Sequence, residues 1–256
     1  MFFEKPADRF VDRFALNPIG YGDEGPEDLT GVVVRYHLNE TTGSAVPDSS
    51  GNGRNGTCQN MENGDWVAGK EHLHNCLNFG GTNEYVDCGA IASFERTDTF
   101  SIEAWFKTNP VGASCCVVSK FNGGGSNRGW MIWVTTSGLV LFVLAGSLAK
   151  RLYVQSPAGP DYGDNAWHRV MITYDGTSDV SGIKMYIDNT DIAFDVNVNV
   201  LDITTIDAAN MRIGAHATAS WMVGMVDELV IHDRVKDFAY DTYRWNGGEG
   251  KERLPS

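Results

Sequence analysis

A polar loop at residues 48–56 combines turn-forming residues with oxygen-bearing side chains directly after the β-rich run 32–38. Asp48 offers a carboxylate, Asn52 and Asn55 offer amide oxygens, and the glycines between them let backbone carbonyls turn inward. Ca²⁺ takes about six to eight oxygen ligands of this kind. The loop therefore predicts a calcium site, although the same composition is also typical of a solvated turn.

A second carboxylate, Asp227, stands inside the apolar run 222–231. A carboxylate buried in such a run without a partner would be costly. Asp227 therefore needs either a cation or strong hydrogen-bond donors, and backbone amides are the alternative to a metal.

Paired carboxylates could also act in catalysis, because retaining glycosidases hold two carboxyl groups about 5–5.5 Å apart. On one strand this spacing corresponds to residues i and i+2, and no Glu-x-Asp-x-Glu pattern occurs in the chain. Asp227 and Glu228 are adjacent, so a regular strand would point them to opposite faces. The chain also lacks a Gly-x-Ser-x-Gly elbow, and its histidines do not have zincin spacing. We therefore expect no enzymatic activity.

The elements that must position these residues are mostly strands. Many glycines and abundant β-branched and aromatic residues predict an all-β chain with tight turns, including turns at 136–138 and at Asp188-Asn189. Residues 235–245 are expected to form one short helix, with Asp237 near its start. We predict strands near 31–38, 74–80, 84–88, 99–107, 115–121, 129–136, 139–145, 150–155, 166–175, 182–194, 210–214 and 221–232.

Short motifs in a fixed order along residues 31–248 resemble the laminin-G-like branch of the concanavalin A-like lectin/glucanase superfamily. The resemblance implies an antiparallel two-sheet jelly-roll β-sandwich. It also implies that Asp48 and Asp227 meet at a structural calcium ion, with loop carbonyls near Asn52 and Asn55. The motifs are Asp48-Ser49-Ser50-Gly51, Leu77-Asn78-Phe79-Gly80-Gly81, Phe100-Ser101-Ile102-Glu103-Ala104-Trp105, Trp167-His168-Arg169-Val170, Met185-Tyr186-Ile187-Asp188-Asn189 and Gly224-Met225-Val226-Asp227-Glu228-Leu229.

Carbohydrate binding is the main function that we expect, because lectin-like sites place aromatic faces against the C–H groups of sugars and fix their orientation with a few polar side chains. Trp105 and Trp167 match core positions of the family. The remaining aromatic residues are better candidates for exposed contact, and the polar loop 122–128 could add donors. The candidates are Trp66, Trp130, Tyr162, Trp221 and Arg128.

Residues 1–30 differ from the rest of the chain and predict an irregular docking arm, followed by one jelly-roll domain at 31–256. The arm is expected to pack either on its own domain or on a neighbouring subunit. The arm is rich in Phe and Pro and has no apolar stretch typical of a signal peptide. It suggests a second function, that of a virus or phage structural or decoration protein that assembles through the arm as a homo-oligomer. The expected location is then the virion surface, with an extracellular or cell surface as the alternative. A carbohydrate-binding module of a larger system is a third possibility.

Charge and composition narrow the partners further. The net charge is −13, with 33 acidic and 20 basic residues, and this balance disfavours nucleic acid. No run of about 18 apolar residues is present, so we expect no membrane insertion. The five cysteines lack zinc-ligand spacing and are expected to be free buried thiols, with a Cys58–Cys76 bridge left open.

Overall fold

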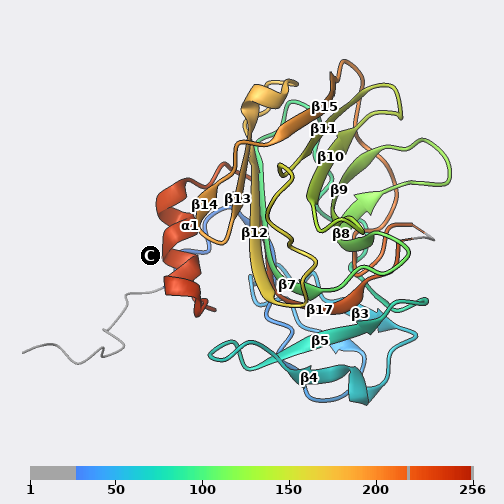
Figure 1. Cartoon of the computed structure of the whole chain (residues 1–256). Helices are drawn as coiled ribbons and strands as arrows, with labels where there is room; N and C mark the ends of the chain where they lie inside the picture. Colours follow the sequence, from blue (N-terminus) through green and yellow to red (C-terminus); the bar gives the residue numbers. More distant parts are fainter. Residues whose placement is uncertain (1–26, 218–219, 255–256) are drawn as a thin grey trace, which may run out of the picture.

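The computed structural model describes residues 27–217 and 220–254. Two antiparallel sheets pack face to face in these residues, as the all-β jelly-roll prediction requires (Figure 1). Most of residues 1–30, the predicted arm, lies outside the described part. Of its described residues, Glu27 accepts hydrogen bonds from Arg35 and from the Leu254 amide at 2.6 Å. This end of the predicted arm therefore contacts the domain itself.

The first sheet has eight strands in the order β14-β13-β12-β7-β17-β5-β4, and β1 pairs with the second half of β17. Its central strands bring together the Glu103 and Asp227 regions of the chain. The strands are β1 (Val32–Tyr36), β4 (Trp66–Ala68), β5 (Asn75–Gly80), β7 (Phe100–Thr108), β12 (Trp167–Tyr174), β13 (Ile183–Ile187), β14 (Thr190–Asp191) and β17 (Val223–His232).

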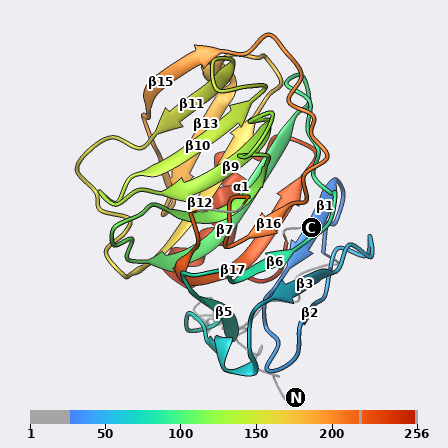
Figure 2. The same cartoon turned by 90° about the vertical axis from the view of Figure 1, so that its right-hand side faces the viewer.

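The second sheet has nine strands in the order β15-β11-β10-β9-β8-β16-β6-β3-β2. Strands β9, β10, β11 and β15 cross the front of the molecule in Figure 2, with the helix behind them. The strands are β2 (Ala45–Val46), β3 (Gly56–Gln59), β6 (Tyr85–Asp87), β8 (Cys115–Phe121), β9 (Gly129–Val134), β10 (Val140–Ala145), β11 (Arg151–Gln155), β15 (Asp195–Val200) and β16 (Arg212–Ile213).

The main core lies between the two sheets, where alternate residues of each strand point inward. Phe106 and Ile172 of the first sheet are fully buried, as are Ile132 and Phe142 of the second. All five cysteines are buried and free. The prediction of free thiols is therefore confirmed, and the Cys58–Cys76 alternative is not formed.

One helix, α1 (Phe238–Trp245), covers the outer face of the eight-stranded sheet beside β13 and β14 (Figure 1). The Asp237 carboxylate accepts a hydrogen bond from the Tyr240 amide at 2.9 Å and so caps the helix, as the sequence suggests. Asn246 ends the helix in the left-handed conformation. Three short 3₁₀ turns complete the described elements, at Asn63–Asp65, Val180–Gly182 and Asn246–Gly248. No described helix is long and apolar enough to span a membrane.

Most predicted strands match the structure, with two informative differences. The stretch 182–194 is not one strand, because Asp188 and Asn189 have positive φ and turn the chain into the β13–β14 hairpin. Strands β2, β3, β4 and β15 were not predicted. The first three have two to four residues each, whereas β15 shows the polar and apolar alternation of a strand and was overlooked. It lies at the sheet edge, where it pairs only with β11.

Candidate functional site

The predicted calcium loop is closed by its own hydrogen bonds. Asp48 accepts backbone hydrogen bonds from Arg35 at 3.1 Å, Ser50 at 2.9 Å and Arg54 at 2.9 Å. Burial would raise the pKa of Asp48, but these hydrogen bonds outweigh it and hold the pKa below its ordinary value. The Asp48 carboxylate is therefore satisfied as an anion without a metal.

The two asparagines of the loop are also engaged by the backbone. Asn55 Oδ1 accepts a hydrogen bond from the Asp48 amide at 2.9 Å, and Asn52 Nδ2 donates to the Val32 carbonyl at 2.8 Å. Asp227 accepts a hydrogen bond from the Glu228 amide at 2.8 Å and is packed against Gly69. Backbone groups therefore engage all four side chains, and the calcium site of Asp48, Asn52, Asn55 and Asp227 that the resemblance implies stays a prediction.

This arrangement predicts a stability effect that does not depend on calcium. Asp48→Ala removes the acceptor for three backbone amides, and hydrogen bonds to a charged group contribute about 1.5–3 kcal/mol. We expect a loss of about 2 to 3 kcal/mol in the free energy of unfolding, equal in Ca²⁺ and in EDTA. Urea unfolding in both buffers measures it, with Asp202→Ala, which removes an exposed carboxylate paired to Lys150, as the control. A loss of stability that appears only in Ca²⁺ would instead support a calcium site at this loop.

A β-bulge in β17 corrects the expectation that Asp227 and Glu228 point to opposite faces. Val226 and Leu229 both belong to the inter-sheet core, so the two residues between them share the outer side. Glu228 takes up the extra residue with φ 47°. Both carboxylates are buried below 2 % exposure, and Glu228 Oε2 accepts from Arg244 at 3.0 Å. The pair is therefore part of the packing beneath the C-terminal segment rather than of an open cleft.

Three of the predicted sugar contacts belong to the core. Trp66, Trp130 and Tyr162 all line the inter-sheet cluster, and Trp130 is fully buried. The indole nitrogens of Trp66 and Trp130 donate to the Gly43 and Ala92 carbonyls. The expectation that these three rings are exposed is therefore wrong, because their side chains point into the sandwich.

The other two predicted contacts lie near the surface but in different surroundings. Trp221 is half-buried, and its ring centroid lies 6.0 Å from that of Tyr85. Arg128 is half-buried as well, and its Nε donates to the Gly146 carbonyl at 3.2 Å. Trp221 thus lies beside a further aromatic residue, whereas Arg128 bonds to the turn between β10 and β11.

A band of aromatic side chains lies on the outer face of the nine-stranded sheet. The face is identified by alternation: Ile132 and Ile213 point into the core, so their strand neighbours Trp133 and Arg212 point outward. Strands β9, β8, β16 and β6 are adjacent in the sheet, so their outward side chains form one continuous surface. We call this surface the aromatic band; it comprises Trp133, Phe121, His216, Arg212, Tyr85 and Trp221.

Ring contacts hold the aromatic band together. His216 lies between Phe121 and Trp133, with ring centroids 5.1 Å and 6.0 Å away. At the other end the Arg212 guanidinium lies 4.6 Å from the Tyr85 ring centroid, a cation–π contact. Burial and the nearby charge of Arg212 lower the pKa of His216, which keeps this imidazole neutral near pH 7.

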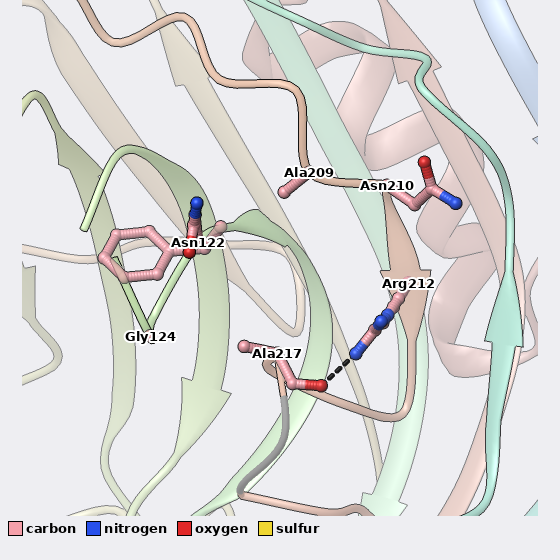
Figure 3. Close-up of a pocket in the computed structure, with 7 residues that line it drawn as sticks. Asn122, Gly124, Ala209, Asn210, Arg212 and Ala217 are labelled. Atoms are coloured by element: carbon pink, nitrogen blue, oxygen red, sulfur yellow. Dashed lines mark hydrogen bonds between the residues drawn. The ribbon is translucent and has the colours of Figure 1, made fainter. Parts of the chain in front are cut away.

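A pocket of about 320 Å³ opens within the band. Figure 3 shows Arg212 reaching toward Ala217, whose carbonyl accepts its hydrogen bond, with Asn122 and Asn210 on either side. The pocket is lined by Phe121, Asn122, Gly124, Ala209, Asn210, Arg212 and Ala217. The pocket therefore presents one aromatic ring, two amides and one cation. The amide nitrogens of Asn122 and Asn210 already donate to Asp207 and Asp87, which fixes the orientation of both side chains.

The sequence analysis predicted one part of this site. The polar loop 122–128 was expected to supply donors, and Asn122 does line the pocket. Trp133, Tyr85 and Arg212 were missed. In β9 every residue is apolar, so the sequence does not show which tryptophan faces outward.

Solved structures that are similar to this chain include binding domains of a mosquitocidal protein and of botulinum neurotoxins. The binding domain of Paraclostridial Mosquitocidal Protein 1 is similar with a TM-score of 0.64 at 13% identity, over 86% of this chain and 53% of that one. The receptor binding domain of botulinum neurotoxin D has a TM-score of 0.60 at 14% identity, over 86% and 53%. This chain spans about half the length of these domains, and the likeness establishes the fold.

A structure of botulinum neurotoxin type C is similar with a TM-score of 0.62 at 13% identity, over 86% of this chain and 51% of that one. Cell entry of that toxin is described as dependent on interaction with two ganglioside molecules. No curated protein sequence matches the chain. The family described as the concanavalin A-like lectin/glucanases superfamily matches residues 79–237, which is more than half of the chain. The order of motifs, the two-sheet jelly roll and this match agree, and the chain belongs to the concanavalin A-like lectin/glucanases superfamily.

Proposed function

We propose that this chain is a non-catalytic, lectin-like domain that binds glycans carrying an acidic sugar through the aromatic band. The single observation that carries the proposal is the Arg212 pocket set between aromatic rings on the outer face of the nine-stranded sheet. Aromatic rings favour the C–H faces of sugars, and a guanidinium binds a carboxylate through two parallel hydrogen bonds.

The size and composition of the pocket support this function. Its volume of about 320 Å³ lies at the lower end of the range of ligand sites, and suits a single sugar unit better than a long chain. Asn122 and Asn210, whose amide nitrogens are held by Asp207 and Asp87, would accept hydrogen bonds from sugar hydroxyls through their amide oxygens, beside the Arg212 cation. Arg212 is notable in a chain of net charge −13, because it offers positive charge at a ligand-sized opening.

The structural relatives support the same ligand class. One of them, a botulinum neurotoxin serotype D ligand binding domain, is described in complex with N-acetylneuraminic acid, and it is similar with a TM-score of 0.62 at 14% identity. Its sugar is acidic, which agrees with an arginine in the pocket of this chain. Glycans are displayed on surfaces, so this function would suit the virion or extracellular location expected from the sequence.

Carboxylates beside the pocket support a binding role rather than catalysis. Asp207 accepts hydrogen bonds from the Ser126 hydroxyl at 2.6 Å and the Ala209 amide at 2.8 Å. Burial would raise its pKa, but these hydrogen bonds together outweigh burial and hold the pKa below its ordinary value. A glycosidase general acid needs a raised pKa, so Asp207 does not suit that role.

A glycan panel with matched sialylated and desialylated members tests the proposal. We expect binding to sialylated glycans that is lost on desialylation and reduced at least tenfold by Arg212→Gln. Arg234→Gln, which removes an exposed arginine on the other sheet, is the control and should bind as the wild type does. Binding that is equal for both glycan sets, or that survives Arg212→Gln, would contradict the acidic-sugar site.

A further inference from the structure

A histidine and two carboxylates from distant parts of the chain meet on the outer side of the eight-stranded sheet. His37 follows β1, Glu228 lies in β17, and Glu252 belongs to the C-terminal segment 249–254. One potential ligand atom from each lies within 4.8 Å of the other two. Asn39 joins them, because its Nδ2 donates to Glu252 Oε1 at 2.8 Å. This cluster does not touch the aromatic band, so it is independent of the proposed glycan site.

Two local backbone features position the cluster. Leu38 is buried in the core with φ 58°, and its neighbours His37 and Asn39 bond to Glu228 and Glu252 on the outer side. On the opposing strand, the bulge at Glu228 brings its carboxylate to the same side as Asp227. A regular strand at residues 227–228 would turn one of the two carboxylates away.

Asp227 supplies an independent sign that a ligand belongs here. It is fully buried, and its Oδ2 has no hydrogen-bond partner within residues 27–217 and 220–254. Asn39 Oδ1 is likewise buried and unpartnered among these residues. An unpaired buried oxygen of this kind is costly unless a proton or a cation occupies it.

The charges of this region are not balanced by its described ion pairs. Arg244 pairs with Glu228 at 3.0 Å, but it also holds Glu103 at 3.2 Å. Glu252 has only the exposed His74 imidazole at 3.7 Å among its described ion pairs. Glu228 also pairs with His37, so the imidazole and both glutamates are already drawn together at the place where a cation would bind.

The donor atoms indicate the class of cation. Ca²⁺ takes oxygen ligands alone, whereas an imidazole nitrogen combined with carboxylate oxygens is the ligand set of Zn²⁺ and similar transition metals. We propose that His37, Glu228 and Glu252 bind one divalent transition-metal ion of the Zn²⁺ class, beside the unpartnered Oδ2 of Asp227. The ion fastens segment 249–254 to β17 and to the end of β1. When the ion is bound, His37 and Glu228 both contact the ion, and the hydrogen bond between them is lost.

The test uses the full chain, first stripped with EDTA and then incubated with Zn²⁺ or with Ca²⁺. After desalting, elemental analysis should find one zinc ion per chain. Zinc at about a hundredfold excess over its Kd should raise the Tm by roughly 5–10 °C, whereas Ca²⁺ should leave it nearly unchanged.

Variants separate this site from zinc held elsewhere. His37→Gln and Glu252→Gln should each lose the bound zinc and the rise in Tm, and Asp227→Asn, which removes the unpartnered charge beside the ligands, should reduce both. Asp227→Asn mimics a protonated carboxyl and Glu252 is partly exposed, so these two should keep the EDTA-state Tm of the wild type. His72→Gln is the matched control, because His72 is an exposed histidine beside Glu249 at 3.3 Å.

Three outcomes would overturn the proposal. The first is a wild-type chain that binds no zinc, which would mean that Asp227 is satisfied by a proton. The second is zinc binding that is kept by Asp227→Asn and Glu252→Gln but lost by His72→Gln. The third is stabilisation by Ca²⁺ and not by Zn²⁺ that disappears in Asp227→Asn.

Discussion

Arg244→Met should lower the free energy of unfolding by about 3–5 kcal/mol, the effect expected when one partner of a buried ion network is removed. Arg244 is 1 % exposed and lies on α1, facing the outer side of the eight-stranded sheet. Its guanidinium donates to Glu103 at 3.2 Å and to Glu228 at 3.0 Å. It also donates to the carbonyls of Lys251 and Arg253. The substitution leaves two buried carboxylates short of a partner and releases the C-terminal segment.

Chemical denaturation of wild type and Arg244→Met measures this loss directly. Arg234→Met is the matched control, because Arg234 is exposed and pairs only at the surface with Asp233 among the described ion pairs. A change below about 1 kcal/mol in Arg244→Met would show that the network is not needed to hold α1 on the sheet.

The second large effect is a loss of stability in acid that originates at Glu103. Burial would raise the pKa of Glu103, but the Arg244 and Arg169 guanidinium groups outweigh burial and lower it to about 2, from 4.5. A carboxyl group with a lowered pKa stabilises the fold fully above its unfolded pKa and loses this contribution as the pH falls. A shift of this size corresponds to about 3 kcal/mol, lost between pH 4.5 and about 2.

Comparison with Glu103→Gln isolates this contribution. The variant is less stable at neutral pH, because Arg169 and Arg244 lose their charged partner. Its free energy of unfolding should fall less steeply than that of the wild type between pH 4.5 and 2. Asp227 has a raised pKa and acts in the opposite sense, since its cost grows as the pH rises above 3.8, but it is common to both proteins. Parallel curves would contradict the assignment to Glu103.

The fold was largely predictable because its signals are local. The Asp237 cap lies directly before α1, and the Asp188-Asn189 pair lies at the β13–β14 turn, where positive φ is required at both residues. The ordered motifs extend these local signals along the chain. A jelly-roll sandwich follows from many such elements at once, so errors in single strands did not change it.

The sites were less predictable because they depend on which face of a strand each side chain occupies and on which distant groups pair with it. Trp130 and Trp133 lie three residues apart in a strand that is apolar throughout, and only the pairing register shows that Trp133 points outward. Glu228 has φ 47° without being a glycine, so nothing in the sequence marks the bulge. Asp48 bonds to backbone amides of residues up to 13 positions away, and such donors leave no trace in residue types.

Glycan binding at the Arg212 pocket is tested most directly by calorimetric titration of one sialylated oligosaccharide into the wild type, Arg212→Gln, Trp133→Ala and Arg234→Gln. The aromatic band predicts saturable binding by the wild type and by Arg234→Gln, with affinity at least tenfold weaker in Arg212→Gln and reduced in Trp133→Ala. Equal affinity in all four proteins, or no binding by a folded wild type to any sialylated glycan, would contradict the proposed function.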